Sequence, residues 1–530
     1  MRSSLDALMA IVVISTCAMA GISATKILLV PSNINSHVVY FSRLGVDLAK
    51  LGNTVGVVVP SNARVPDFVT DDIENFTYLK YSVDSDTPFI NSPEASKIIV
   101  NMAMTTSSIR RMTMLRQLEK VQHEVEEDCI RLQENIQMMR HIQATGYAFA
   151  IMDMIGANCY STIPYALGIP RATLSVSVSS PYLFRVPRFA SFPNLGSVSD
   201  RPTFPERLTA FLIDRMMSTF ALSDNECYMK KYAPNRPYVD MLHLYRHQSL
   251  WFFLEDLSVN YPLPQMPNTV AVGDIMVGTK ERPLSSEIKT FIFKSKRGVI
   301  IVSFGSYCDF FPPEINQRLC EAFIEVTKRH ALSVIWKLKA EGFCHNDYIL
   351  TLPWIPQYDI LADPRVKLFI SHGGFNGIIE SVYHSKPLII LPLYLDQPAN
   401  AAAAESKGYA IQMKIADFTS ESLVSNIDKL LTDPSYKQNI NLASAILRDR
   451  RDTPAQRVSA MIDHVVKYGD RHLRTGAFEL STLQFMTFDI FAALVAAAVI
   501  VLSVVALFCF RVYRGCFKYF QVKPKKAKSQ

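Results

Sequence analysis

The sequence predicts an α/β protein with two doubly wound domains of parallel strands, followed by one membrane-spanning helix. Strand-like and helix-like segments alternate twice along the chain, a proline cluster separates the two series, and a long apolar segment lies near the carboxyl end. The chain of 530 residues is longer than one hydrophobic core ordinarily requires. A hydrophobic content of 49% fits a globular protein that also enters a membrane.

The amino terminus has the pattern of a secretory signal peptide. Arg2 precedes a short apolar run, and the small residues Ala18 and Ala20 mark a cleavage region, so residues 1–24 are predicted to be removed. The alternative is a retained anchor, for which the apolar run is short.

The first domain is predicted over residues 25–262. Short apolar and β-branched runs alternate there with segments whose apolar residues recur every three or four positions. The expected strands are 26–30, 55–59, 147–154 and 172–178, and the expected helices are 38–51 and a long region from Met112 to Met139.

A linker is predicted over residues 263–285, where prolines cluster, and a second domain over residues 286–465. Because ligands of doubly wound sheets bind at the carboxyl ends of the strands, the polar residues that follow these strands are candidates for a site. The expected strands are 299–303, 333–337, 369–371 and 388–391, and the expected helix is 314–330.

The carboxyl end predicts a single membrane span. A return segment over residues 466–489 precedes residues 490–510, which are apolar apart from Ser503 and long enough to cross the hydrocarbon core as a helix. The tail over residues 511–530 holds seven Lys and Arg residues and no acid, so we expect a cytoplasmic tail and a lumenal body. A buried helix of a soluble domain is the alternative.

The tail also indicates a compartment. Lys526 and Lys528 match the dilysine retrieval signal of endoplasmic reticulum membrane proteins, which predicts a single-pass type I protein of that membrane. An ordinary basic flank of a membrane span is the alternative. Without the signal peptide and the tail, 47 basic and 47 acidic residues remain, so charge gives no support for nucleic-acid binding.

The predicted lumenal body has six cysteines and one glycosylation sequon. Because no CxxC motif or Cys/His cluster occurs, a zinc site is not expected, whereas an oxidising lumen permits disulfides whose pairing the sequence leaves open. Asn75 begins the sequon Asn-Phe-Thr and is a predicted glycan acceptor. The cysteines are Cys129, Cys159, Cys227, Cys308, Cys320 and Cys344.

The stretch FISHGGFNGIIE has the pattern of a phosphate site. His372, Gly373 and Gly374 follow a strand and precede a helix. Glycines there let the backbone approach a ligand closely, and the unpaired N–H groups of the helix attract an anion. Asn376 lies in the first helical turn, and the carboxylate of Glu380 could accept hydrogen bonds from the hydroxyls of a ribose.

Two flanking motifs provide for the other parts of a nucleotide sugar. Trp354 offers an aromatic face for a base, and Gln357 offers an amide for a sugar hydroxyl. Asp396 and Gln397 follow a later strand and add two more hydroxyl-binding groups. Taken singly, each of these residues is more simply a turn glycine, a core aromatic or a solvated charge, but their order along the chain favours a nucleotide-sugar site.

The segment from Trp354 to Gln397 resembles the signature of the UDP-glycosyltransferase family, whose animal members include the UDP-glucuronosyltransferases. The resemblance extends over essentially the whole chain, through residues 266–270 to the anchor and the basic tail. It implies a GT-B fold, in which two Rossmann-like domains face a cleft, the first taking the acceptor and the second the UDP-sugar. It also implies roles for single residues: Trp354 stacks on uracil, Gln357 and Glu380 hold the ribose, Ser306 and His372 hold the diphosphate together with neighbouring amides, and Asp396 and Gln397 bind the transferred sugar.

A catalytic pair is expected in the first domain. His37 follows the first strand at the start of a helix, whose positive end disfavours the protonated ring and leaves it able to take a proton. Asp153 ends a later strand, where its carboxylate could orient that ring. The resemblance places the catalytic histidine and aspartate at these positions; a capping histidine and a loop acid are the alternatives. Family members often have an aromatic residue where Val38 follows here, which bears on the acceptor side and not on the base.

One motif imitates a metal site. Asp84-Ser85-Asp86 has the form of the metal-binding DxD of another class of glycosyltransferases, but its polar surroundings favour a solvated turn. The anion seat at the helix end stabilises a leaving group without a metal, so neither a metal nor another cofactor is expected.

Together these patterns predict an inverting UDP-glycosyltransferase that transfers glucose or glucuronate to a hydroxyl of a small lipophilic molecule. Leu263 lies where many glucuronate-using relatives carry Arg, which favours glucose without deciding it. The alternatives are a non-catalytic membrane protein that binds a UDP-sugar or a lipophile, and a transferase that acts on lipid-linked glycans. The acceptor and a homo-oligomeric state stay open.

Overall fold

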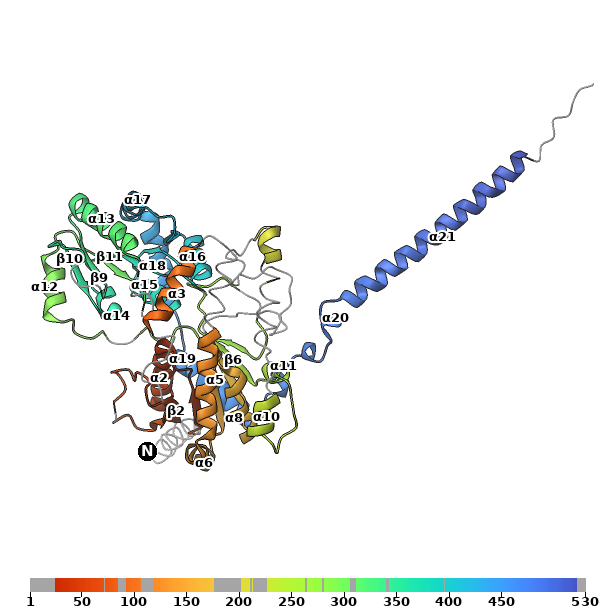
Figure 1. Cartoon of the computed structure of the whole chain (residues 1–530), viewed down its shortest axis with the longest axis horizontal. Helices are drawn as coiled ribbons and strands as arrows, with labels where there is room; N and C mark the ends of the chain where they lie inside the picture. The colour runs from red at the N-terminus through yellow and green to blue at the C-terminus, as the bar shows by residue number, and fades with distance from the viewer. Residues whose placement is uncertain are drawn as a thin grey trace, which may run out of the picture. The chain divides into compact units, whose positions relative to one another are not determined.

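The chain divides into two units, Met1–Arg474 and Thr475–Gln530. The first unit carries both α/β halves, and the second carries a long apolar helix (Figure 1). The structure is a computed structural model that describes residues 24–70, 72–83, 92–105, 119–175, 202–209, 212, 226–262, 265–278, 281–305, 311–339, 343–394 and 396–521.

Seven parallel strands form the sheet of the first half, in the order β3-β2-β1-β4-β5-β6-β7. Alternate residues of β1 pack on opposite faces, Ile27 and Leu29 in one hydrophobic cluster and Leu28 and Val30 in another. Both faces are therefore covered, as the predicted parallel sheet requires. The strands are β1 Lys26–Val30, β2 Thr54–Pro60, β3 Phe76–Tyr81, β4 Phe149–Asp153, β5 Arg171–Ser175, β6 Leu250–Phe253 and β7 Thr269–Ala271.

The second half has a sheet of six parallel strands in the order β10-β9-β8-β11-β12-β13. Its central strands β8 and β9 are buried along their whole length. The strands are β8 Val299–Ser303, β9 Ser333–Lys337, β10 Ile349–Leu352, β11 Val366–Ser371, β12 Leu388–Ile390 and β13 Ala410–Gln412. The two doubly wound sheets confirm the predicted fold class.

Helices connect and cover the strands of both sheets (Figure 1). Those in the first half of the chain are α2 Asn35–Lys50, α3 Pro93–Met104, α5 Glu119–Glu134, α6 Ile136–Thr145, α7 Ala157–Tyr160, α8 Thr162–Leu167, α10 Glu226–Tyr232 and α11 Met241–Arg246. Those that follow are α12 Ser286–Lys294, α13 Pro313–His330, α14 Gln357–Leu361, α15 Phe375–Tyr383, α16 Gln397–Ser406, α17 Ser420–Thr432, α18 Pro434–Arg448 and α19 Pro454–Tyr468, then the 3₁₀ turns η2 Arg471–Leu473 and η3 Gly476–Phe478, and finally α20 Thr482–Phe485 and α21 Phe488–Gln521.

Each sheet has one point where the strand order reverses, between β1 and β4 in the first and between β8 and β11 in the second. The loops after two such strands run to opposite sides of the sheet, so a crevice opens between them at the carboxyl ends. The predicted base His37 follows β1, at the first of these points. The predicted phosphate-binding residues His372, Gly373 and Gly374 follow β11, at the second.

The two halves exchange helices. Ile99 and Val100 of α3 pack in the hydrophobic cluster of the second sheet, although α3 comes from the first half of the chain (Figure 1, orange). In return α19 packs against α2 of the first half, and Asp463 accepts a hydrogen bond from the Thr25 hydroxyl at 2.7 Å. The core of each half is therefore completed by a segment of the other.

Element bounds differ from the sequence prediction at a few places. The first helix begins at Asn35, three residues earlier than expected, and the long helical region breaks at Asn135, whose side chain caps α6 by accepting from the Met138 N–H. Strand β7 lies inside the expected linker and pairs with β6 of the first sheet. Helix α19 packs on α2 of the first half and crosses the expected end of the second domain at residue 465. Sequence periodicity predicts which residues are buried, but it does not predict which element packs against them.

Two disulfides join the cysteines that the sequence left unpaired, Cys129–Cys159 and Cys320–Cys344. The first fastens α5 to α7 beside β4, and the second fastens α13 to the segment before β10. Cys227 is exposed and unpaired, and Cys308 lies outside the described residues.

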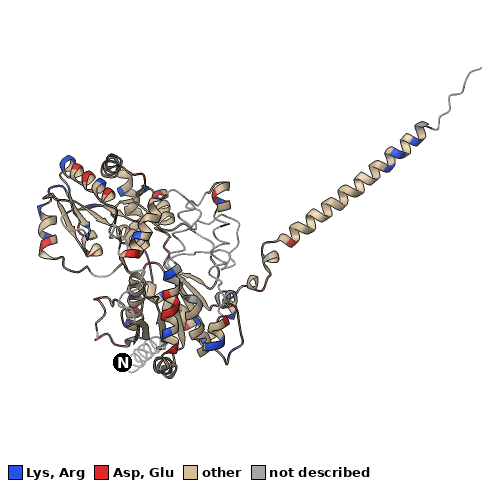
Figure 2. Ribbon diagram, viewed as in Figure 1, with Lys and Arg blue, Asp and Glu red and all other residues tan. Residues whose placement is uncertain are grey.

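The apolar helix α21 has the length and composition of a membrane span. Within its stretch Phe488–Tyr519 an 18-residue window has a mean hydropathy of 3.0, and no charged residue lies between Asp489 and Arg511 (Figure 2). Residues 1–23 of the predicted signal peptide and residues 522–530 of the predicted tail lie outside the described residues.

Truncating the packed face of α19 is expected to destabilise the first unit. Ile462 is fully buried, so Ile462→Ala leaves a cavity that costs about 2–5 kcal/mol of folding free energy. Denaturant unfolding of the detergent-solubilised full chain measures this loss. Val466→Ala, on the same helix but 42% exposed, serves as the control. Equal effects of the two substitutions would contradict the packing described for α19.

Candidate active site

The first switch point brings together the predicted catalytic pair. Asp153 is the last residue of β4, and His37 lies in the first turn of α2, after the loop that follows β1. Their side chains meet with Nδ1 of His37 2.6 Å from Oδ2 of Asp153. Asp153 is fully buried, whereas the His37 side chain is 14% exposed, so one edge of the imidazole stays accessible.

The carboxylate of Asp153 is held by several donors. Oδ2 accepts from the Ser32 hydroxyl at 2.6 Å, the Ser32 N–H at 3.1 Å and His37 Nδ1, and Oδ1 accepts from the Ile155 N–H at 3.1 Å. A buried anion is tolerated only with such partners. Because Nδ1 of His37 donates to this carboxylate, Nε2 is left to accept a proton. The Tyr40 hydroxyl, 2.7 Å from the same Nδ1, contacts the ring from the next turn of α2.

The second switch point has the form of an anion seat. Gly373 has a φ of +86° and Gly305, after β8, a φ of +79°, both in the left-handed region that favours glycine. A Cβ atom at Gly305 or at Gly374 would lie 2.7 Å from Nε2 of His372. No side chain caps the amino end of α15, which begins at Phe375, so its first N–H groups stay available to a ligand.

His372 lies between these glycines as an uncharged ring. Burial, with help from the positive charge of Lys337, lowers the pKa of His372 to about 4. Its Nδ1 is buried and has no hydrogen-bond partner within the described part of the chain. Lys337, at the end of β9, donates from Nζ to the Gly305 carbonyl at 2.6 Å. The seat therefore offers one unpartnered imidazole nitrogen and one nearby ammonium group, which fits a phosphate.

The residues predicted for a base and a ribose lie beside that seat. Trp354 is 60% exposed, and Gln357 donates from Nε2 to Oε2 of Glu380 at 2.6 Å. Burial, together with the nearby carboxyls of Asp274 and Asp359, raises the pKa of Glu380 to about 8, against the hydrogen bond from Gln357. Glu380 is therefore largely protonated at neutral pH and offers a neutral carboxyl group to hydroxyls.

The predicted sugar-binding residues reach toward the catalytic pair. Burial raises the pKa of Asp396, while the hydrogen bond from Asn400 and the charge of His37 lower it. Asn400 donates from Nδ2 to Asp396 at 2.6 Å and to the Gly373 carbonyl at 3.1 Å, which links the sugar residues to the anion seat. Oε1 of Gln397 accepts from the N–H groups of Leu393 and Tyr394, so that atom already stabilises the loop before α16.

Most of the predicted site residues lie at the two switch points, and a few lie outside the described residues. Asn376 lies half-buried in the first turn of α15. Asn75 is exposed, as a glycan acceptor must be, and precedes β3. Ser306, Leu263 and the motif Asp84-Ser85-Asp86 lie outside the described residues, so their predicted roles stay predictions.

Several residues of the site were not predicted from the sequence. Ser32 lies in the loop after β1 at the first switch point, and Lys337 ends β9, the strand next to β8, so their positions at strand ends could have singled them out. Asp274 gave no such signal because it lies in the expected linker. Its Oδ2 is buried without a hydrogen-bond partner among the described residues, and burial raises its pKa to about 7. Arg64, in the loop after β2, lies with its guanidinium 5.5 Å from the Trp354 ring centre.

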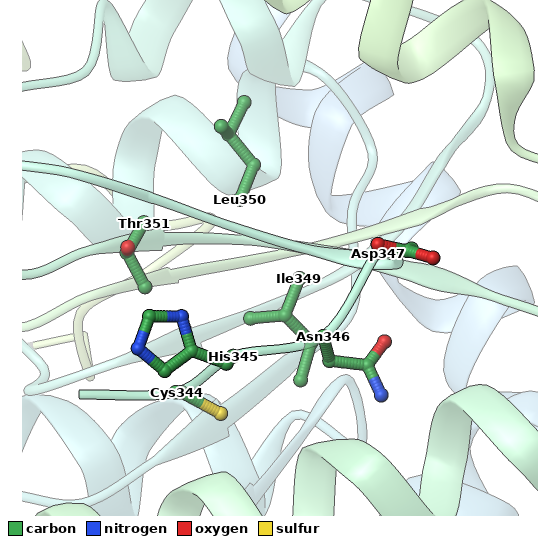
Figure 3. Close-up of a pocket in the computed structure, with 7 residues that line it drawn as sticks. All are labelled: Cys344, His345, Asn346, Asp347, Ile349, Leu350 and Thr351. Carbon is green, nitrogen blue, oxygen red and sulfur yellow. The ribbon is translucent and has the colours of Figure 1, made fainter. Parts of the chain in front are cut away.

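A separate surface pocket of about 670 Å³ opens along the edge strand β10 (Figure 3). It is lined by residues 344–347 and 349–351, and none of the predicted site residues is among them. Cys344 of this lining belongs to a disulfide, and the peptide edge of β10 is the outer edge of the second sheet. The pocket carries no arrangement of groups that bears on the chemistry at the switch points.

Comparison with known proteins adds a family to this geometry. The family model described as UDP-glucoronosyl and UDP-glucosyl transferase matches residues 25–523. UDP-glucuronosyltransferase 1A3 of Homo sapiens is 27% identical over 425 residues, which cover 77% of this chain and 76% of that protein. The 2-hydroxyacylsphingosine 1-beta-galactosyltransferase of Rattus norvegicus is 26% identical over 514 residues, which cover 94% of this chain and 90% of that protein.

Solved structures of glycosyltransferases share the fold. The glycotransferase of kitacinnamycin matches with a TM-score of 0.55 and 15% identity over 84% of this chain and 100% of that one. Phytolacca americana UGT2, solved with UDP-2fluoro-glucose and pterostilbene, matches with a TM-score of 0.54 and 14% identity over 83% of this chain and 99% of that one. These likenesses confirm the GT-B architecture of two doubly wound halves.

Replacing Glu380 by Gln is expected to flatten the pH dependence of stability between about pH 4.5 and 8. Against an ordinary pKa of 4.5, the pKa of about 8 means that in this window the folded chain keeps a proton that the unfolded chain has lost. Stability therefore falls as pH rises through the window, by at most about 1.4 kcal/mol per pH unit for this one group. Glu380→Gln lacks that dependence.

Unfolding midpoints of the ligand-free full chain across the window measure the slope. Glu314→Gln, an exposed change on α13, is the control and should keep the wild-type slope. The buried neighbour Asp274 keeps a residual slope of the same sign in both variants. A Glu380→Gln slope equal to that of wild type would show that Glu380 is ionised in the empty site.

Proposed function

The chain belongs to the family of UDP-glucuronosyl and UDP-glucosyl transferases, and from this premise we propose that it transfers glucose or glucuronate, with inversion, to a hydroxyl of a small lipophilic acceptor. The chain is an enzyme of the UDP-glycosyltransferase class, and what is proposed is the role of each residue, the donor, the acceptor and the compartment. One observation carries the mechanism: Nδ1 of His37 lies 2.6 Å from Oδ2 of Asp153, which is fully buried.

In the proposed reaction His37 is the general base. The acceptor hydroxyl gives its proton to Nε2, its oxygen attacks the anomeric carbon, and the bond from that carbon to the β-phosphate oxygen breaks, with UDP leaving on its electron pair. Asp153 holds Nδ1–H throughout and stabilises the ring once it is charged. The single displacement inverts the anomeric configuration.

The donor is proposed to lie along the second switch point. The uracil stacks on Trp354, Gln357 and Glu380 hold the ribose, and the diphosphate lies against the His372–Gly374 loop with Ser306 near it. Asp396 and Gln397 bind the transferred hexose, which the closeness of Asp396 to His37 supports. Lys337 adds a positive charge near the phosphates.

No resident metal or other cofactor is proposed. The amino end of α15, the unpartnered Nδ1 of His372 and the ammonium of Lys337 are groups that can stabilise the departing diphosphate. We therefore expect the reaction to proceed in excess chelator.

The proposed location is the endoplasmic reticulum membrane, with α21 as the single span, the body in the lumen and the tail in the cytoplasm. The basic tail and its dilysine motif support that orientation. The exposed Asn75 would then carry a glycan, and the two disulfides fit an oxidising compartment.

Removing the base is expected to lower transfer by about 10²–10⁴-fold. His37→Ala removes the proton acceptor, and Asp153→Asn removes the anion that orients it, so both should lose acceptor-dependent UDP release while keeping UDP binding. His141→Ala, an exposed change on α6, is the matched control. Near-full transfer by His37→Ala would rule out this mechanism.

The donor is tested by UDP release from the membrane-embedded protein with UDP-glucose, UDP-glucuronate, UDP-galactose and UDP-N-acetylglucosamine. Each donor is supplied with and without a mixed panel of phenols, steroids and sphingolipid alcohols, with excess chelator in a parallel series. We expect release that requires an acceptor, is supported by UDP-glucose or UDP-glucuronate and persists with chelator. Binding of UDP without release from any donor would favour a carrier, and loss of release with chelator would contradict the metal-free mechanism.

A further inference from the structure

Arg64 connects the first half of the chain to the exposed indole of the second. It lies in the loop after β2, with its guanidinium carbon 5.5 Å from the ring centre of Trp354. Arg64 is exposed and forms no ion pair within the described part of the chain, so no carboxylate competes for its charge.

The loop that presents Arg64 is fixed at the edge of the first sheet. The Ser61 N–H donates to the Tyr81 carbonyl at 2.7 Å, which continues the pairing of β2 with β3. Asn62 accepts from the Asn33 side chain at 2.9 Å. Asn33 follows Ser32, which binds the catalytic carboxylate, so the Arg64 loop and the catalytic loop are tied to each other.

Trp354 is the tryptophan available to a ligand. Trp251 and Trp336 are 2% and 0% exposed and belong to the cores of the two sheets, whereas Trp354 is 60% exposed. Two cations lie near its ring, Arg64 from the first half and Lys337 from the second, each 5.5 Å from the ring centre. A large exposed indole between two cations from different halves is arranged to receive a flat, electron-rich group.

We propose that Arg64 covers the uracil of the bound donor, so that the base is sandwiched between the indole of Trp354 and a guanidinium from the opposite half. The inference rests on the proposed function, because it takes the base seat at Trp354 as its starting point. A planar guanidinium stacks on bases as readily as on aromatic side chains. The long, exposed side chain of Arg64 can swing outward to admit the base without moving its loop.

The charge of the ligand decides whether the Arg64 guanidinium stays over the bound base or moves away from it. A cation that lies over an empty indole could compete with the base for that face and depart on binding. A UDP-sugar carries a diphosphate, so its arrival adds negative charge near Arg64 and favours keeping the guanidinium at the site. Since the Arg64 loop is tied through Asn62 and Asn33 to the catalytic loop, donor binding and the geometry of the base residue His37 are coupled through this contact.

The test is UDP binding to the full chain in lipid nanodiscs, measured by titration calorimetry, a readout that does not depend on Trp354. Arg64→Ala is expected to raise the Kd for UDP by roughly 3- to 10-fold, with Arg64→Lys in between. Arg207→Ala, which removes an exposed arginine over Phe204 in the first half, is the matched control and should leave the Kd unchanged. An unchanged or lowered Kd for Arg64→Ala would overturn the proposal, a lowered one by showing that Arg64 competes with the base.

Uridine separates contact with the base from contact with the phosphates. If Arg64 covers the base, Arg64→Ala raises the Kd for uridine by a factor similar to that for UDP. Competition with UDP measures the Kd for uridine. Weakening of UDP and inorganic pyrophosphate with uridine unchanged would place Arg64 on the phosphates and overturn the proposal.

Trp354→Ala distinguishes failure of this inference from failure of the proposed donor site. If Trp354→Ala weakens UDP binding and Arg64→Ala does not, the proposed donor site is supported and the proposed Arg64 contact is wrong. If Trp354→Ala binds UDP as wild type does, the base seat itself is wrong.

Discussion

The strand order of two parallel sheets is the constraint on which the rest of the structure depends. Parallel strands present all their carboxyl ends at one edge, and a reversal of strand order sends neighbouring loops apart and opens a crevice there. The loops after β1 and β4 thereby bring His37 and Asp153 to hydrogen-bond distance, and the loops after β8 and β11 bring Gly305 against His372. Each pair is far apart in sequence and adjacent only because of this order.

Burial then sets the charge state of each group at the crevices. Four donors from Ser32, His37 and Ile155 satisfy the buried carboxyl oxygens of Asp153. Glu380 has one such donor, Gln357, and two acidic neighbours, Asp274 and Asp359, so burial raises its pKa. The uncharged His372 follows the same rule with the opposite sign, because burial and Lys337 both disfavour a second cation. The predicted phosphate seat therefore holds an uncharged imidazole beside the Lys337 side chain, an arrangement that suits an anion.

The two halves are joined by more than a linker. Helices α3 and α19 each complete the core of the opposite half, and Asp463 hydrogen-bonds to Thr25 at the start of β1. One contact at the site also crosses between the halves, that of the Arg64 guanidinium with the Trp354 ring. The proposed transfer requires groups from both halves to meet at one place. The exchanged helices α3 and α19 fix the halves to each other by packing.

The sequence by itself determined the class of the fold, the apolar helix and nearly all of the polar residues at the crevices. Local patterns were sufficient for these: buried β-branched runs, a glycine pair before a helix, and a histidine and an aspartate at strand ends, read with the help of a family signature. Only the tertiary structure decided which cysteines pair, that β7 belongs to the first sheet, that α19 packs on the first half, and that Ser32, Lys337, Arg64 and Asp274 lie at the site. The reason is that periodicity and propensity record how a segment meets its surroundings, whereas partners distant in sequence are selected by the packing of the whole chain.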